Sequence, residues 1–220
     1  MNTTGACNYY DWSANMYGPT EEYLSTFAYI LMGFHLKFTK ENKKSNILDV
    51  GCGTGLMLKI AHKMGFKNIH GIDGSQGMLN CAVESTNRFI PINNFHYHNF
   101  CSGKWGGEGK KFSHIISHSV IPFIPDLNML FENFSDLLEK DGLISFNFLE
   151  REEWGGNLLE DEYGKYSADE YYEKNYKFYL RKESEVVSKL TQNFIILESC
   201  KFTYSTSEEI QNNIVVAQKK

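Results

Sequence analysis

The chain has no closely spaced pair of cysteines, no long apolar run and no excess of positive charge. Its five cysteines are scattered and odd in number, with no CxxC pair, which argues against a disulfide framework or a zinc site. The longest apolar run, 27–34, is far shorter than the roughly 20 residues that cross a membrane. Residues 1–7 also lack the basic and apolar regions of a signal peptide. These absences favour a soluble, cytoplasmic protein.

Charge and length narrow the class further. The net charge of −5 and the pI near 5.8 provide no attraction to nucleic acid or to an anionic membrane. At 220 residues the chain suits one domain, 1–220, with a large core. Aromatic residues make up 15% of it, and they either fill that core or line a ligand cavity.

The most informative stretch of the sequence is 46–78. It opens with an apolar run typical of a buried parallel strand, made by Ile47, Leu48 and Val50. Glycines then follow at alternate positions, where backbone without a Cβ can adopt positive φ and let a ligand approach: Gly51, Gly53 and Gly55. Apolar residues at helical spacing come next and stop at Gly65. Strand, glycine turn and helix are the first half of a βαβ unit.

A second predicted strand, 68–73, ends in Asp73, eighteen residues beyond Gly55. A carboxylate at that strand end is suited to accept both hydroxyls of a ribose, as in dinucleotide folds about 20 residues past their glycine turn. The dinucleotide fingerprint needs its third glycine at position 56, where this chain has Leu56. The pattern therefore favours a nucleoside ligand and argues against a dinucleotide oxidoreductase.

These motifs resemble those of class I S-adenosylmethionine-dependent methyltransferases. The run DVGCGTG at 49–55 is similar to their first motif, and GIDGS at 71–75 is similar to their second, ribose-binding motif. The run YDWSA at 10–14 and the run DGSQGML at 73–79 resemble the methyltransferase-like branch with a YDxWA opening and a DGSxxML second motif.

The resemblance continues through 112–126 and 137–148, which look like the fourth strand with its loop and the fifth strand of the small-molecule branch. Ser113 replaces the usual Asp, and Pro122 and Phe123 replace two histidines, so no base can stand at those two positions. The resemblance implies a Rossmann-like α/β fold: a seven-stranded, mostly parallel sheet with helices on both faces. The tail, 194–204 and 210–217, would supply its antiparallel C-terminal hairpin.

The same resemblance implies S-adenosyl-L-methionine as methyl donor and S-adenosyl-L-homocysteine as product. Asp49 and the glycine turn would hold the methionyl end, Asp73 the ribose, and Asn99 with Phe100 the adenine. The full predicted donor site comprises Tyr10, Tyr17, Asp49, Gly51, Cys52, Gly53, Gly55, Asp73, Gly74, Met78, Asn99, Phe100 and Ser117. Met78 serves equally well as core filler, and the two tyrosines as packing beneath the following helix, expected from Thr20 to about Lys40.

Two side chains are candidates for catalysis. His118 follows the predicted strand 112–119 at the edge where doubly wound sheets bind ligands, and histidine titrates near neutrality. It could instead be a structural histidine bonded to a neighbouring loop. Tyr17 would contribute from the aromatic segment that precedes the nucleotide unit. His96 and His98 share one face of the predicted strand 94–100, but with no third ligand we expect no metal.

An acidic segment of the sequence indicates what kind of acceptor the protein would bind. Residues 150–173 carry nine acidic and two basic side chains, a net charge of −7 against +2 for the rest of the chain, interleaved with one Trp and four Tyr. Acid and aromatic groups suit a cationic acceptor, although a solvated acidic lid explains the composition as well. We expect residues 1–42 to form lid helices and 150–180 a substrate-lid insertion.

The sequence thus predicts a methyltransferase acting on N or O of a small molecule, with an amine favoured. The donor's sulfonium makes its methyl electrophilic, so the protein mainly has to align and desolvate a nucleophile. The alternative is a non-catalytic S-adenosylmethionine-binding module or partner subunit. Nucleic-acid and membrane partners are not expected, and the sequence leaves the oligomeric state open.

Overall fold

The computed structural model describes residues 10, 21–40, 45–150, 179, 181–203 and 211–220. Its centre is one seven-stranded sheet in the order β3-β2-β1-β4-β5-β7-β6. The strands are β1 (Asn46–Val50), β2 (Asn68–Asp73), β3 (Phe95–Tyr97), β4 (Phe112–Ser117), β5 (Leu138–Glu150), β6 (Phe194–Thr203) and β7 (Gln211–Lys219). Pairing is parallel from β3 through β5 and antiparallel for β5–β7 and β7–β6. The predicted sheet and its C-terminal hairpin are confirmed.

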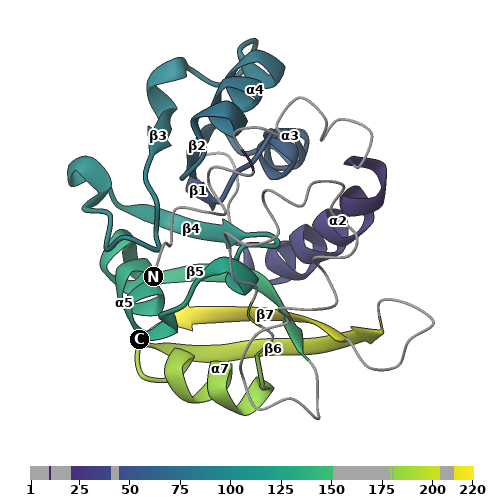
Figure 1. Ribbon diagram of the computed structural model, residues 1–220, viewed down its shortest axis with the longest axis vertical. Coiled ribbons are helices and arrows are strands. Elements are labelled where there is room, and N and C mark those ends of the chain that lie inside the picture. Colours follow the sequence, from purple (N-terminus) through teal and green to yellow (C-terminus); the bar gives the residue numbers. More distant parts are fainter. Residues whose placement is uncertain (1–9, 11–20, 41–44, 151–178, 180, 204–210) are drawn as a thin grey trace, which may run out of the picture.

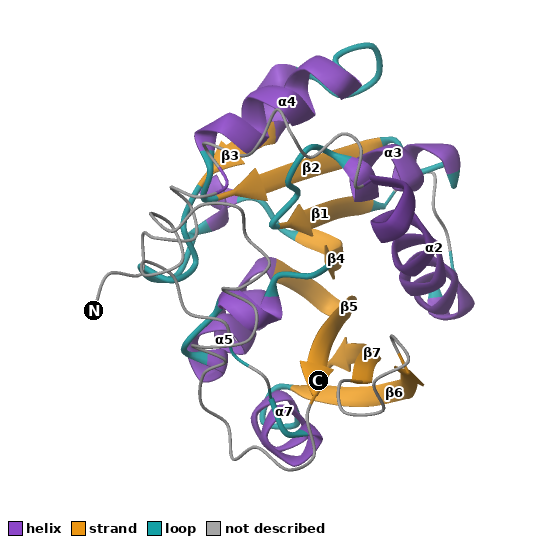
Figure 2. Ribbon diagram, turned by 45° about the vertical axis from the view of Figure 1, so that its right-hand side comes forward, coloured by secondary structure: helices purple, strands orange, loops and turns teal. Residues whose placement is uncertain are grey.

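Helices cover both faces of the sheet (Figures 1 and 2). Helices α2 (Glu21–Phe38), α3 (Leu56–Lys63) and α4 (Gln76–Thr86) pack into one apolar cluster, and α5 (Leu127–Leu137) and α7 (Glu183–Leu190) pack into the other. Three short 3-10 turns complete the described elements: η3 (Ile92–Asn94), η4 (Gly107–Gly109) and η5 (Ile121–Phe123). Among the described helices, none combines the length and apolarity that a membrane crossing requires.

Helix α2 forms because one of its faces is buried in the core. Ala28, Leu31, Met32 and His35 recur at helical spacing and are all fully buried against the sheet and α3. The helix ends at Phe38, two residues before the predicted Lys40. Of the predicted N-terminal lid 1–42, the structure describes Tyr10 and 21–40, and there α2 packs on the face of the sheet.

Strand β3 is shorter than the predicted 94–100 because side chains close turns at both of its ends. Asn94 lies in η3, where its Nδ2 donates to the Ile69 carbonyl at 2.9 Å. Beyond the strand, the Asn99 side chain accepts from the Cys101 amide at 2.8 Å and turns the chain away from the sheet. The last backbone bond from this segment to β2 runs from His98 N to the Asp73 carbonyl at 3.0 Å.

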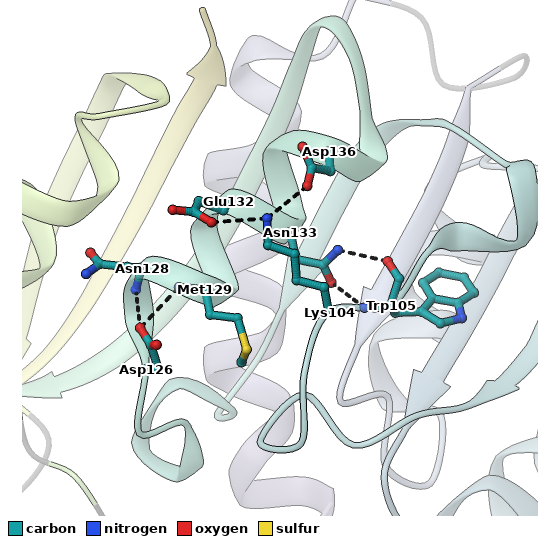
Figure 3. Close-up of polar contacts among 8 residues, drawn as sticks. All are labelled: Lys104, Trp105, Asp126, Asn128, Met129, Glu132, Asn133 and Asp136. Atoms are coloured by element: carbon teal, nitrogen blue, oxygen red, sulfur yellow. Dashed lines mark hydrogen bonds and ion pairs between the residues drawn. The ribbon is translucent and has the colours of Figure 1, made fainter.

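The loop after Phe100 is braced against α5 (Figure 3). Asn133 of α5 accepts from the Trp105 amide at 3.0 Å and donates to the Trp105 carbonyl at 2.8 Å. Lys104 bridges Glu132 at 3.0 Å and Asp136 at 3.1 Å on the same helix. Trp105 is thereby buried in the core although it stands in a glycine-rich, polar stretch.

Candidate active site

The strand order reverses between β1 and β4, and the predicted glycine turn lies at that point, directly after β1. Open α/β sheets bind ligands at such a reversal, at the carboxyl ends of their strands. The turn is fixed to β2, because the Gly51 and Cys52 amides both donate to the Ile72 carbonyl, at 2.8 and 3.0 Å. Gly51, Gly53 and Gly55 have φ of 71°, 52° and 92°, which confirms the positive φ predicted for them.

The three glycines serve different contacts. A Cβ on Gly51 would stand 2.2 Å from Cγ2 of Val120, in the loop after β4, so the protein itself excludes a side chain there. A Cβ on Gly55 would touch α4 at 3.3–3.4 Å, where the two helices approach closely. A Cβ on Gly53 would meet no described atom within 4 Å. Among the described residues, Gly53 is therefore the glycine of this turn whose Cβ direction no atom occupies, which suits the close approach of a ligand.

This difference predicts that Gly51→Ala and Gly53→Ala fail in different ways. Gly51→Ala should lower the free energy of unfolding by about 2–4 kcal/mol. The alanine would have to adopt a left-handed backbone conformation, and its Cβ would collide with Val120. Gly53→Ala has only the left-handed cost of about 1–2 kcal/mol, and its methyl should chiefly weaken donor binding. Urea unfolding and calorimetric titration with the donor measure the two effects. Equal stability of the two variants would contradict this division of roles.

Asp73 connects the glycine turn after β1 to the start of α4 through hydrogen bonds. Its Oδ2 accepts from the Gly53 amide at 2.8 Å and its Oδ1 from the Ser75 amide at 2.9 Å. Ser75 in turn caps α4 by accepting from the Met78 amide at 3.1 Å. Each carboxylate oxygen has lone-pair capacity for a second donor, so the predicted role toward ribose hydroxyls is compatible with these bonds.

Asp49 is a buried carboxyl without compensation. It is 4% exposed, and neither of its oxygens has a hydrogen-bond partner among the described residues. Burial, and secondarily the charge of Asp73, raises its pKa well above the ordinary value. A buried carboxylate of this kind is costly unless a ligand brings a cation or hydrogen-bond donors to it. The ammonium group of S-adenosylmethionine has that chemistry, so the residues present fit the predicted donor.

Three other predicted donor residues are engaged by the protein. Asn99 Oδ1 accepts from the Cys101 amide, and the Ser117 hydroxyl donates to the Val50 carbonyl at 3.1 Å. The Phe100 ring is 5% exposed and packs edge-on against Phe134 with centroids 6.3 Å apart. The predicted contacts of Asn99 and Phe100 with adenine and of Ser117 with the donor stay predictions, with Asn99 limited to its second lone pair.

Three more predicted donor residues lie on α4, in the glycine turn and directly after β2. Met78 is buried on the inner face of α4, as either of its two predicted roles requires. Cys52 is buried beside Gly71, and burial raises the pKa of its thiol well above the ordinary value. Gly74 lies between Asp73 and Ser75, and the Ser75 amide donates a hydrogen bond to the Asp73 carboxylate.

Of the two N-terminal tyrosines in the predicted donor site, the structure describes Tyr10. The ring of Tyr10 meets Phe123 of η5 at right angles, with centroids 5.5 Å apart, beside the loop that follows β4. Tyr17 lies outside the described residues, and its predicted contact stays a prediction.

His118 lies at the carboxyl edge of the sheet, as predicted, but directly after β4, because that strand ends at Ser117 and not at the predicted residue 119. Its Nε2 is buried and has no hydrogen-bond partner within the part of the chain that the structure describes. Burial lowers the pKa of this imidazole to about 4, so the ring is neutral at physiological pH. The predicted alternative is a structural histidine bonded to a neighbouring loop; Nε2 makes no such bond to a described residue, and the choice between the two roles stays open.

The other two histidines of the predicted strand, His96 and His98, have different hydrogen-bond partners. His96 lies at 3.3 Å from His70, Nε2 to Nδ1, while His98 Nε2 bonds the Gly103 carbonyl at 2.9 Å. Among the described residues no group of three His, Cys, Asp or Glu side chains could hold a metal ion.

Two polar networks were not predicted. Asn147 of β5 accepts from the Ser119 amide at 2.7 Å, next to His118. On the face covered by α2, His35 bonds Ser145 at 2.7 Å and His114 at 3.0 Å. A usable signal existed in each case, because an Asn inside a buried apolar strand and a His on the apolar face of a helix both need partners.

Comparison with known proteins accords with this geometry. A family model described as a methyltransferase domain matches residues 23–184. Human methyltransferase-like protein 27 is 56% identical over 36 residues, which are 16% of this chain and 15% of that protein. The alignment thus spans a small part of that relative's length.

Solved structures share the fold. An S-adenosylmethionine-dependent methyltransferase from Mesorhizobium loti superposes with a TM-score of 0.63 at 16% identity, over 82% of this chain and 94% of that one. Phosphoethanolamine N-methyltransferase 2 from Haemonchus contortus, in complex with phosphomonomethylethanolamine and S-adenosylhomocysteine, superposes with a TM-score of 0.69 at 16% identity, over 99% and 59%. Since the family match includes most of the residues, this chain belongs to the methyltransferase domain family.

Proposed function

We propose that this chain transfers a methyl group from S-adenosylmethionine to N or O of a small molecule, with an amine as the favoured acceptor. The observation that carries the proposal is the buried carboxyl of Asp49, which lies two residues before Gly51, senses the charge of Asp73 and has no hydrogen-bond partner among the described residues. A cationic amino-acid group would neutralise it, and the donor has one. Membership of the methyltransferase family supplies the reaction class.

The chain's own residues would divide the donor between them. Asp49 would accept from the ammonium group, the open face at Gly53 would admit the ligand close to the backbone, and Asp73 would accept from the ribose hydroxyls. The donor supplies an electrophilic methyl on a sulfonium. An acceptor held in line by these residues would take the methyl through its lone pair, with the carbon–sulfur bond breaking and the sulfur leaving as a neutral thioether.

His118 would take the acceptor's proton or hydrogen bond. Its ring is neutral at physiological pH, so its free nitrogen can accept from an N–H or O–H. An alcohol or phenol needs such a base as it reacts, whereas a neutral amine can lose its proton to water afterwards. Tyr17 remains a proposed second contributor.

The preference for an amine rests on charge. The segment 150–173 has a net charge of −7, and β5 delivers its first residue, Glu150, at the carboxyl edge of the sheet. On the far side of this segment, the Tyr179 amide donates to the Pro122 carbonyl of η5 at 2.6 Å. Both of these described residues lie at the edge where an acceptor would enter. Glu150 itself is paired with Lys201 at 3.0 Å, so the other acidic residues of the segment would supply the negative potential that attracts a cation.

A second candidate, a donor-binding subunit without turnover, is favoured by one observation. The two histidines of the family pattern after the fourth strand are Pro122 and Phe123 here, and both lie in η5. Methyl-labelled donor incubated with the protein and a small-molecule cell extract separates the two functions. Label in a small cationic fraction would support an amine methyltransferase, whereas confirmed donor binding without transfer would support the non-catalytic subunit.

Asp73→Ala is predicted to weaken donor binding by about 100-fold or more, since two charge-assisted hydrogen bonds are worth about 1.5–3 kcal/mol each. The variant should stay folded, with a stability loss of about 1–3 kcal/mol from the Gly53 and Ser75 amides that it leaves unbonded. Calorimetric titration with the donor and thermal unfolding measure both.

Asp126→Ala is the matched control. Asp126 also accepts two backbone amides, those of Asn128 and Met129 at 3.0 and 3.1 Å, but as the N-cap of α5. Its loss should cost comparable stability and leave donor affinity within about twofold. If Asp73→Ala binds donor like the wild type, the ribose assignment is wrong.

A further inference from the structure

The residue after His118 is held in an unusual backbone conformation. Ser119 has φ of 60°, one of three non-glycine residues with positive φ in the described chain. This left-handed conformation costs about 1–3 kcal/mol for a residue with a side chain and persists only where surrounding contacts enforce it. The Ser119 amide donates to Oδ1 of Asn147 at 2.7 Å, and Asn147 is 3% exposed within β5.

Asn147 is itself oriented by the neighbouring strand. Its Nδ2 donates to Oδ1 of Asn212 on β7 at 3.0 Å, and Asn212 is buried too. With the donating nitrogen committed to β7, the carbonyl oxygen of Asn147 is the atom that faces Ser119. The two amides therefore form a chain from β7 through β5 to the loop after β4.

The other flank of His118 is fixed as well. The Ser117 hydroxyl donates to the carbonyl of Val50, the last residue of β1. Two residues on from His118, Val120 lies against Gly51 so closely that a Cβ there would stand 2.2 Å away. The segment 117–120 is thus clamped to β1, β5 and the glycine turn, with His118 between the clamps and its Nε2 unbonded to any described residue.

We propose that Asn147, oriented by Asn212, is the positioning residue for His118: by accepting the Ser119 amide it enforces the left-handed turn that holds the imidazole beside the donor turn. This inference rests on the proposed role of His118 in methyl transfer. Neither asparagine touches the reacting atoms in this scheme. Their contribution is the conformation of the loop.

The direct test is a nitrogen-15 NMR titration of the His118 ring, identified by the signal missing from His118→Gln. Asn147→Ala removes the acceptor, so Ser119 should relax and the ring should gain water. The titration midpoint of His118 is then expected to rise by at least one pH unit from its wild-type value. Asn212→Ala leaves the Ser119 bond in place but frees the amide, and should shift the midpoint in the same direction by less.

Asn133→Ala is the matched control for lost stability. Asn133 is another buried asparagine with both amide atoms bonded, but to Trp105, on the opposite face of the sheet. It should lower thermal stability and leave the His118 titration unchanged. An unchanged His118 midpoint in both Asn147→Ala and Asn212→Ala would overturn the proposal.

Transfer of labelled methyl into the small-molecule extract adds the functional readout. Asn147→Ala should slow transfer at least tenfold with donor affinity within about twofold of wild type. Asn147→Asp can still accept the Ser119 amide, with Asn212 turning its amide to donate, and should recover transfer to within about threefold. If wild type itself transfers nothing, the proposed function fails while the NMR result still decides the positioning role.

Discussion

Replacing Asp49 with asparagine is expected to weaken donor binding by about 30- to 1000-fold and to stabilise the ligand-free fold. Removing one partner of a buried charge pair costs about 2–4 kcal/mol of binding, which is the stated loss of affinity. Without donor, Asp49 has no described partner for either oxygen. The neutral amide removes a buried charge, which should add about 1 kcal/mol or more to the free energy of unfolding.

The pH dependence of this variant has a definite sign. The folded-state pKa of Asp49 is raised above its unfolded value, so the folded protein binds more protons over the window between them. Stability from this group therefore falls as pH rises through that window. The gain in Asp49→Asn over wild type should accordingly grow with pH, and wild-type donor binding should release a proton. Denaturant unfolding and calorimetric titration in buffers of different ionisation enthalpy measure these effects.

Asp136→Asn serves as the control, because Asp136 is an exposed carboxylate on α5 that pairs with Lys104. It should change neither donor affinity nor the number of protons released. Wild-type affinity in Asp49→Asn would mean that the donor's cationic end binds elsewhere.

Local patterns carried the prediction of the nucleotide half of the molecule. The glycine turn, the strand before it and Asp73 lie within 28 residues, and their geometry follows from short-range backbone rules. The positive φ of the three glycines and the end of β2 at Asp73 therefore came out as predicted. What the pattern could not contain was the cause of each glycine, since Val120 closes the space at Gly51 from 69 residues away.

Contacts that depend on strand register were beyond the sequence. Asn147 meets Ser119 only because β5 pairs beside β4, and Asn212 reaches Asn147 through the antiparallel register of β7. The same holds for Asn99, whose side chain closes a turn and so shortens β3. The predicted substrate-lid insertion 150–180 lies outside the described residues except for Glu150 and Tyr179, and it stays a prediction.

The fold should lose stability steeply in mild acid because of a buried histidine pair. His35 Nε2 and His114 Nδ1 are 3.0 Å apart, and His35 Nδ1 bonds the Ser145 hydroxyl. Burial lowers the pKa of His35 to about 3 and that of His114 to about 4. Both values lie below the unfolded value of 6.5. At any pH between the folded and the unfolded pKa, the unfolded chain therefore binds more protons than the folded protein. Stability is complete above about pH 6.5 and is lost as pH falls toward 4.

The expected size follows from linkage: each histidine contributes about 2.5 kcal/mol between pH 7.5 and 4.5, and the pair about 5 kcal/mol. The double variant His35→Leu with His114→Leu should flatten the stability profile by that amount, measured by urea unfolding at a series of pH values. The difference between variant and wild type cancels groups common to both, including Asp49, whose contribution has the opposite sign.

Phe66→Leu controls for lost packing, because the Phe66 ring contacts both histidines, with centroids 6.5 Å from His35 and 5.5 Å from His114. It should lower stability by a similar amount at every pH and keep the wild-type slope. A double leucine variant as acid-sensitive as wild type would assign the acid loss to other groups. Since α2 is joined to the sheet through this pair, the acid-induced loss should begin with α2, seen as early amide exchange in 28–35.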